Sequence, residues 1–211
     1  VLRHFETDEK VGGVGGRDLL KDKPEYRAVE PLKEKVGVYT WYGRGYGNHH
    51  CGKGLPRPVH VLKGCNCAYD GKLLREIGFD HRLRGRGAQV GWELSLGFDL
   101  LKRGRMLIYD PAIQVDHWIA PRHDNDQLHR GGVFNAKAIE DMSYNNALVT
   151  KTLIPWYLAF PMVFWSLLWG SPFQPGLMRL FYLEIRRRPN AFASYKASMS
   201  GFIKAFTSGH K

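Results

Sequence analysis

Residues Gly64 to His117 read GCNCAYDGKLLREIGFDHRLRGRGAQVGWELSLGFDLLKRGRMLIYDPAIQVDH. Short apolar runs bounded by Gly and Pro alternate here with one longer helical pattern, which is typical of an α/β domain. The helical pattern runs from Trp92 to Lys102 and ends in a basic turn followed by a glycine. Met106 to Tyr109 and Ile113 to Val115 are predicted as two strands around a turn. This stretch therefore predicts an α/β fold.

The same alternation extends the predicted α/β domain over residues 1–126, with further strands at Val36 to Trp41 and Val59 to Leu62. Residues 127–152 are polar and rich in Asn, with Ala and Ile at roughly helical spacing. They are predicted as a connecting helix on the surface. Residues 153–211 differ in composition and are predicted as a separate helical tail.

The tail begins with an apolar run and continues as a basic, aromatic segment. Leu153 to Gly170 carry no charge and include three tryptophans, at a length near the lower limit for a spanning helix. Pro155 and Pro161 should break or kink a helix here. From Leu177 onward, Arg and Lys alternate with Phe, Tyr, Leu and Met. This pattern predicts association with a membrane by spanning, re-entry or interfacial binding, and the alternative is a core helix of a soluble domain.

The composition is that of a folded, strongly basic protein. Of 211 residues, 44% are hydrophobic, and the formal net charge is +11. The apolar content excludes a disordered chain, and the charge favours anionic partners such as nucleotide phosphates, anionic membranes or nucleic acid. Because the basic residues are dispersed and form no nucleic-acid-binding module, nucleic acid is not an expected partner.

The cysteines allow a zinc site as an alternative, whereas the glycines argue against a dinucleotide-binding site. Three cysteines are an odd number, and Cys65 and Cys67 are too close for an unstrained disulfide, so reduced thiols are expected. A zinc site remains an alternative; its ligands would come from His49, His50, Cys51, Cys65 and Cys67. The glycines between Val11 and Leu20 do not fit the dinucleotide-binding fingerprint in register.

The order and spacing of these segments resemble the second half of bacterial family 2 glycosyltransferases. In that family a Gly-x-Asn-x-Ala strand leads into a helix, then a Gly-Phe-Asp turn, a glycine-rich loop, an acidic helix start and a Tyr-Asp-Pro strand that ends in His. The resemblance covers Val11 to about Gln127 and includes VGGVGGRDLL, Val11 to Leu20.

The resemblance implies a GT-A-like α/β fold and the transfer of a sugar, with inversion, from a nucleotide-sugar donor. The acceptor would be a lipid-linked molecule or a polysaccharide at the cytoplasmic face of a bacterial-type membrane. The family's Asp-x-Asp and nucleotide site would lie upstream of Val1, in roughly 90 to 100 further residues. The chain alone is then expected to be inactive. Asp124 and Asp126 also spell Asp-x-Asp, but they follow the His and are interpreted as a lookalike.

Glu93 is the predicted catalytic residue, because an inverting transfer needs a carboxylate that takes the proton from the acceptor hydroxyl. In the resembling family the base is usually the Asp of a Glu-Asp pair at this helix start. Here that pair falls on Val90 and Gly91, and the following acid-Leu step survives as Glu93 and Leu94. Either Glu93 has become the base, or it only caps a helix and favours its dipole.

His117 ends the last predicted strand. The resemblance implies that it contacts a divalent metal, Mg or Mn, or the diphosphate that this metal neutralises. We expect Glu93 and His117 to converge on one cleft at the carboxyl ends of neighbouring strands. The residues predicted to contact the substrate are Gly64, Asn66, Arg86, Gln89 and Trp92.

A non-enzymatic function is the alternative. A glycosyltransferase-derived protein without a donor half could serve as a structural subunit of a membrane assembly.

Overall fold

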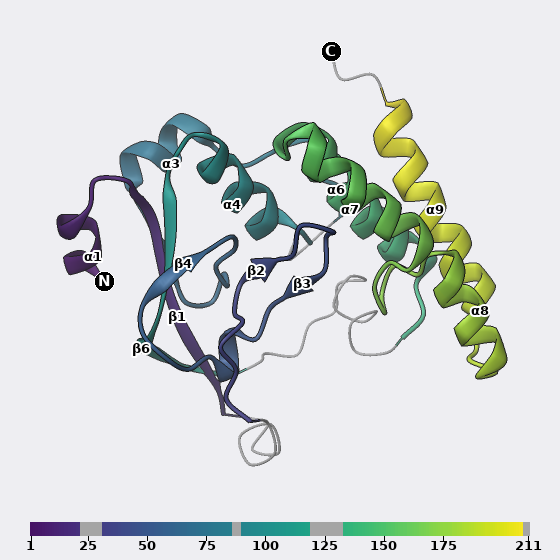
Figure 1. The fold of residues 1–211 in the computed structure, drawn as a ribbon, viewed down its shortest axis with the longest axis horizontal. Coiled ribbons are helices and arrows are strands. Elements are labelled where there is room, and N and C mark those ends of the chain that lie inside the picture. The colour runs from purple at the N-terminus through teal and green to yellow at the C-terminus, as the bar shows by residue number, and fades with distance from the viewer. Residues whose placement is uncertain (22–30, 86–89, 119–132, 209–211) are drawn as a thin grey trace. The chain divides into compact units, whose positions relative to one another are not determined.

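A computed structural model of the chain describes residues 1–21, 31–85, 90–118 and 133–208, and Figure 1 shows its ribbon. These residues belong to two compact units, which are described separately. The first unit comprises Val1–Tyr39, Gly45–Phe79 and Glu93–Pro121, and the second comprises Thr40–Arg44, Asp80–Trp92 and Arg122–Lys211.

The first unit holds the β-structure. Its elements are, in chain order, α1 (Leu2–Thr7), β1 (Val11–Leu20), β2 (Val38–Tyr39), β3 (Gly45–Tyr46), the 3-10 helix η1 (His49–Cys51), β4 (Arg57–Val59), β5 (Cys67–Tyr69), α3 (Gly71–Ile77), α4 (Trp92–Lys102) and β6 (Met106–His117). The main sheet has the strand order β4-β6-β1-β5. β1 is parallel to β6 and antiparallel to β5, and β4 is antiparallel to β6. The chain is thus a mixed α/β protein with a mixed sheet. This confirms the α/β class that the sequence predicts.

Glycines let β1 lie close to its neighbours. A Cβ atom at Gly13 would lie 2.7 Å from the ring of Tyr69 on β5. At Gly16 a Cβ atom would collide with the carbonyl oxygen of Ile113 on β6. Only glycine leaves room for these contacts, so the glycine-rich sequence of β1 has a packing role in a central strand.

The predicted helix from Trp92 to Lys102 is confirmed as α4, with the same bounds. The two short strands predicted after it are wrong, because β6 is one strand of 12 residues. Its pairing with β1 moves from Gly16–Asp110 to Arg17–Gln114, which leaves three residues of β6 in a bulge. The Asp110 carboxylate accepts the N–H of Ala112 at 2.9 Å, so the expected turn forms inside the strand.

The two earlier strands are shorter than predicted. β2 keeps only Val38–Tyr39, and β4 lies at Arg57–Val59 instead of Val59 to Leu62. The N–H groups of His60 and Val61 bond to the carbonyl of Gly37, at 2.8 and 2.9 Å, and therefore leave the ladder with β6. Apolar composition alone does not reveal this change of partner.

The second unit is helical. Its helices are α6 (Ala136–Leu153), α7 (Trp156–Leu168), α8 (Leu177–Ile185) and α9 (Ala191–Thr207). α6 and α9 pack along each other, and a Cβ atom at Gly201 of α9 would collide with the carbonyl oxygen of Glu140 on α6. The buried apolar cluster consists of Leu83, Tyr144, Ala147, Leu148 and Ala205. The helix predicted within residues 127–152 is observed as α6, but its predicted position on the surface is wrong. α6 packs against α9 and carries much of this core, because its small and apolar residues face that helix.

Asn145 of α6 is fully buried and holds the segment before α4. Its amide group donates to the carbonyls of Arg84 and Val90, at 2.8 and 2.7 Å, and its oxygen accepts the N–H of Arg84 at 2.7 Å. The Arg84 guanidinium lies 3.6 Å from the centre of the Tyr144 ring. This segment thus belongs to the helical unit through polar contacts.

The apolar run of the sequence is divided at Pro155, as its prolines predict. α6 ends at Leu153, and α7 begins at Trp156 with Pro161 inside it. Across the described ranges, the helices lack the combination of length and apolar character that crossing a membrane requires.

Candidate functional site

In the first unit, the carboxyl ends of β1 and β6 and the start of β5 lie at the same end of the sheet. The parallel strands β1 and β6 finish side by side, where Leu20 pairs with His117. β5 runs antiparallel to β1, so the turn that precedes β5 lies toward the same end of the sheet. Ligands in open α/β sheets bind at the carboxyl ends of parallel strands. The edge formed by the ends of β1 and β6 is therefore the place to look for a functional site.

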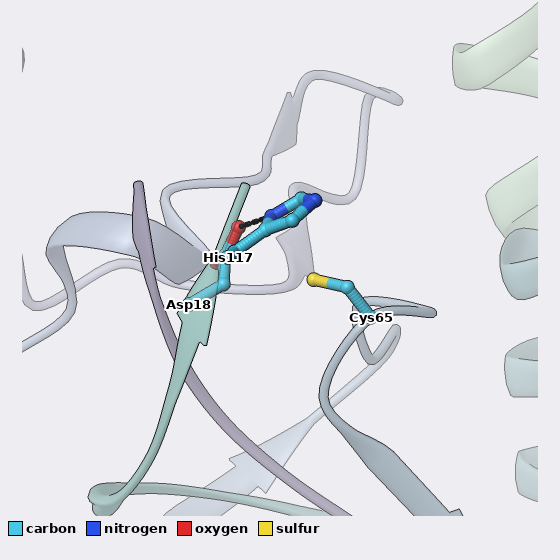
Figure 2. A group of neighbouring side chains, drawn as sticks. All are labelled: Asp18, Cys65 and His117. Atoms are coloured by element: carbon cyan, nitrogen blue, oxygen red, sulfur yellow. Dashed lines mark hydrogen bonds and ion pairs between the residues drawn. The ribbon is translucent and has the colours of Figure 1, made fainter. Parts of the chain in front are cut away.

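Asp18, Cys65 and His117 meet at this edge (Figure 2). Asp18 pairs with Val115, two residues before His117, so the two side chains project from the same face of the sheet. Nδ1 of His117 lies 3.3 Å from Oδ2 of Asp18. The sulfur of Cys65 points toward this pair, and one candidate ligand atom from each residue lies within 4.8 Å of the others.

Asp18 is the buried member of the group, with 3% of its surface exposed. One of its oxygens faces His117, and the other, Oδ1, is buried without a hydrogen-bond partner in the described part of the chain. A buried carboxylate oxygen without a partner is costly, and a bound cation is one way to satisfy it. Asp18 therefore indicates a cation site more strongly than its two neighbours do.

Cys65 contributes a protonated thiol when no metal is bound. The residue is exposed, but its sulfur is turned inward. Burial of the sulfur, together with the Asp18 carboxylate, raises the pKa of Cys65 to about 12. A metal ion would reverse this preference, because coordination stabilises the thiolate.

Carboxylate oxygen, imidazole nitrogen and thiolate sulfur form a donor set that suits transition metals. Zinc binds all three ligand types and, in catalytic sites, keeps a fourth position open. Magnesium prefers oxygen ligands and water, and a thiolate is a poor partner for it. The group is a possible metal site, and it fits a transition metal better than it fits magnesium.

No protein-family model and no curated protein match this chain.

The zinc alternative drawn from sequence spacing assigned Cys65 to different partners. His49 is instead held by the carbonyl of Val61, 3.0 Å from its Nε2, and burial lowers the pKa of its imidazole. Cys51 is buried, and its sulfur approaches the carbonyl of Asn48 at 3.6 Å. Within the described residues, Cys65 gathers with Asp18 and His117 as candidate ligands, and not with these groups.

Glu93 lies in the first turn of α4, in surroundings of its own. Its carboxylate acts electrostatically on Tyr39, Cys67 and Tyr69. In the described ranges, these neighbours do not overlap with those of His117, so a shared cleft of Glu93 and His117 stays a prediction.

A short segment of chain connects the two groups. Cys65 belongs to the group with Asp18, and Cys67 lies near Glu93. Two residues of extended chain span at most about 7 Å between their Cα atoms. The turn at Cys65 and Asn66 leads into β5 at Cys67. It therefore joins a candidate metal ligand, Cys65, to a residue on which the Glu93 carboxylate acts, Cys67.

Asn66 stands between them as a structural residue. It is buried, and its amide group donates to the carbonyls of Arg17 and Ile113, at 3.1 and 3.2 Å. The amide thus joins the turn before β5 to β1 and to the bulge of β6. Both N–H donors are used within the protein, so only its side-chain oxygen is available for the predicted substrate contact.

Of the remaining predicted residues, the structure describes Gly64 and Trp92. Gly64 is exposed in the turn closed by the N–H of Asn66 and the carbonyl of Lys63, which lie 3.0 Å apart. The Trp92 ring packs against the buried cluster of the helical unit. Arg86 and Gln89 lie outside the described residues, as do the lookalike acids at positions 124 and 126.

The sequence predicted His117 as a metal contact and named Cys65 as a zinc ligand with other partners, but it did not single out Asp18. Asp18 carries a signal that could have been used, because an acid inside a glycine-rich apolar strand is rarely buried without a reason. For Cys65 the sequence signal was its place among the cysteines and histidines that could hold zinc, and this signal pointed to other partners. Its role follows from the antiparallel pairing of β5 with β1, which the sequence does not display.

Proposed function

We propose that this chain carries the catalytic, acceptor-side part of an inverting glycosyltransferase that uses a nucleotide-sugar donor. The observation that supports this most directly is the gathering of Asp18, Cys65 and His117 at the carboxyl ends of the parallel strands β1 and β6. A metal site at that edge is what a nucleotide-diphosphate donor requires. The acceptor is a lipid-linked molecule or a polysaccharide.

Asp18, Cys65 and His117 would hold the divalent ion, and their donor set favours zinc over magnesium. The ion would neutralise the charge that develops on the diphosphate leaving group. The protein adds positive charge nearby, because Lys63 acts electrostatically on Cys65 and on His49. This region therefore favours an anionic ligand as well as a cation.

Glu93 is the proposed base. Its carboxylate takes the proton of the acceptor hydroxyl while the hydroxyl oxygen attacks the anomeric carbon from the side opposite the diphosphate. The new carbon–oxygen bond forms as the bond from that carbon to the phosphate oxygen breaks. The nucleoside diphosphate leaves with the electron pair, and the single displacement inverts the anomeric configuration.

The ionisable neighbours of Glu93 have raised pKa values. Burial and the Glu93 carboxylate raise the pKa of Tyr39 to about 12 and that of Cys67 to about 11, and they also raise the pKa of Tyr69. At neutral pH these groups therefore keep their protons. They do not compete with Glu93 for the role of base, and they are available as hydrogen-bond donors.

The first experiment tests the metal site on the chain itself. Titration with Co²⁺ should produce the near-ultraviolet absorption of a cobalt–thiolate bond. Cys65→Ser and Asp18→Asn should each weaken Co²⁺ binding by at least roughly 10- to 100-fold. Loss of a residue that only supports a metal ligand already has an effect of this size. Cys67→Ser, two residues away, is the matched control and should retain the absorption. An equal loss in both cysteine variants would refute the assignment of Cys65.

The second experiment tests sugar transfer in a protein that contains the whole of this chain. Panels of UDP-, GDP- and dTDP-sugars are incubated with Mn²⁺ and with Zn²⁺, and release of the nucleoside diphosphate is followed by mass spectrometry. Glu93→Gln should reduce turnover by at least about 100-fold while Co²⁺ binding is kept. Metal binding without turnover on any donor would instead favour the non-catalytic structural subunit.

A further inference from the structure

We propose that α7 and α8 form a surface that binds the face of an anionic phospholipid bilayer, with the helices lying in the plane of the membrane. The proposal rests on the exposed side chains of the helical unit. It is independent of sugar transfer.

α7 has one face packed on protein and one face exposed. Met162 is buried against Gly43, and the ring centroid of Trp165 lies 4.8 Å from that of Tyr42. The opposite face carries large apolar side chains at a spacing of four, four and three residues. They are Trp156, Phe160, Phe164 and Leu167, and all are exposed. α7 contains no charged residue, so nothing on this face prevents its burial in lipid.

α8 repeats the arrangement. Leu180 is its buried residue, and the exposed stripe follows at a spacing of four residues as Leu177, Phe181 and Ile185. Ile185 has 81% of its surface exposed at the end of the helix. Exposure of such an apolar stripe to water is energetically unfavourable, so stripes of this kind usually mark a surface that binds protein or lipid.

The two helices are joined through their ends. The guanidinium of Arg179 on α8 lies 5.4 Å from the ring centre of Trp169, which caps α7. The segment between them is closed by a bridge from Gly170 to Pro175. α7 and α8 are therefore held as a pair.

The positive charge beside the apolar stripe indicates that this surface binds anionic lipid. Three exposed arginines, Arg186, Arg187 and Arg188, follow directly after the apolar stripe of α8. Arginine beside exposed aromatic residues matches the boundary of a bilayer, where rings lie at the headgroup level and guanidinium groups contact lipid phosphates. The surface therefore favours bilayers with anionic headgroups over neutral ones.

The test uses the full chain and vesicles in a flotation assay. One set of vesicles contains phosphatidylcholine alone, and the other contains phosphatidylcholine with phosphatidylglycerol. The chain should float with the anionic vesicles and much less with the neutral ones. Ile185→Ser should reduce the affinity roughly tenfold, because a buried isoleucine contributes about that factor.

Leu55→Ser is the matched control, since Leu55 in the first unit is also 81% exposed. It should not change vesicle binding. The arginines are tested by replacing Arg186, Arg187 and Arg188 together with Gln, which should weaken binding by about 100-fold. The matching charge control replaces Arg3, Lys72 and Arg75 with Gln and should have a smaller effect.

Three results would overturn the proposal. The first is failure to bind either vesicle, and the second is an equal loss in Ile185→Ser and Leu55→Ser. The third is a chain that sediments as a dimer and becomes monomeric on Ile185→Ser, because a second copy would then cover the face. Circular dichroism of each variant separates these outcomes from loss of the fold.

Discussion

Replacement of Glu140 by Gln should destabilise the helical unit and remove part of its response to acid. Glu140 lies on α6 and reaches across to α9. Its Oε2 accepts hydrogen bonds from Lys204 and Ser200, both at 2.7 Å, and its Oε1 accepts one from Lys137 at 3.3 Å. Burial alone would raise its pKa, but these hydrogen bonds prevail and lower the pKa of Glu140 from 4.5 to about 2.

The size of the effect follows from this lowering. A pKa difference of one corresponds to about 1.4 kcal/mol, so the upper bound for Glu140 is about 3 kcal/mol. The Glu140 side chain is only 16% exposed, but that of Lys204 is 48% exposed and is screened by water. We therefore expect the carboxylate to contribute about 2 kcal/mol to the free energy of unfolding at neutral pH.

The sign of the pH dependence is fixed by the direction of the shift. Because the pKa is lower in the folded state, the contribution is present above pH 4.5 and is lost as the pH falls toward 2. Glu140→Gln should lower the stability at neutral pH and flatten its acid dependence, so that the variant and the parent approach each other in strong acid.

Urea unfolding followed by circular dichroism at several pH values measures this. Glu184→Gln on α8 is the matched control, because Glu184 is exposed and the substitution removes the same charge. Its stability should remain within about 0.5 kcal/mol of the parent. If Glu140→Gln is as stable as the parent at neutral pH, or if its stability falls in acid as steeply as that of the parent, the reasoning about this carboxylate is wrong.

Three further substitutions test packing and polar contacts by urea unfolding. Gly201→Ala should cost about 1 to 3 kcal/mol, although alanine normally favours a helix, because its Cβ would collide with the Glu140 carbonyl; a more stable variant would contradict the close approach of α6 and α9. Asn145→Ala should cost at least about 2 kcal/mol, since it leaves backbone groups of Arg84 and Val90 without their partner. Asn66→Ala should destabilise the first unit by about 1 to 3 kcal/mol; unchanged stability with a weaker acceptor affinity would instead favour its predicted substrate role.

Local features of the fold could be predicted from the sequence. The bounds of α4 were predicted correctly because a helical apolar pattern, a basic last turn and a glycine at 104 all indicate the same end. In the structure this glycine has a φ of 75°, which a residue with a side chain rarely adopts. The division of the apolar run at Pro155 follows from proline chemistry in the same way. Each of these signals is contained within a few residues.

Strand pairing could not be predicted in this way. β1 and β6 are separated by most of the first unit in sequence, yet they pair in parallel along their length. The bulge after Asp110 depends on Gly16, nearly a hundred residues earlier, because only glycine tolerates the Ile113 carbonyl there. The local turn signal therefore predicted two strands. Pairing with β1 on both sides of the bulge keeps β6 a single strand.

The same long-range pairing explains why His117 alone was an incomplete prediction. A histidine at a strand end suggests a ligand, but what it can bind depends on the atoms that other strands bring to it. Asp18 comes from the parallel partner, and Cys65 comes from the turn before the antiparallel one. Since the thiol disfavours magnesium, the topology of the sheet changes which metal the site should prefer. The metal preference is thus a property of strand order, and it can be tested through Cys65 without any knowledge of the substrate.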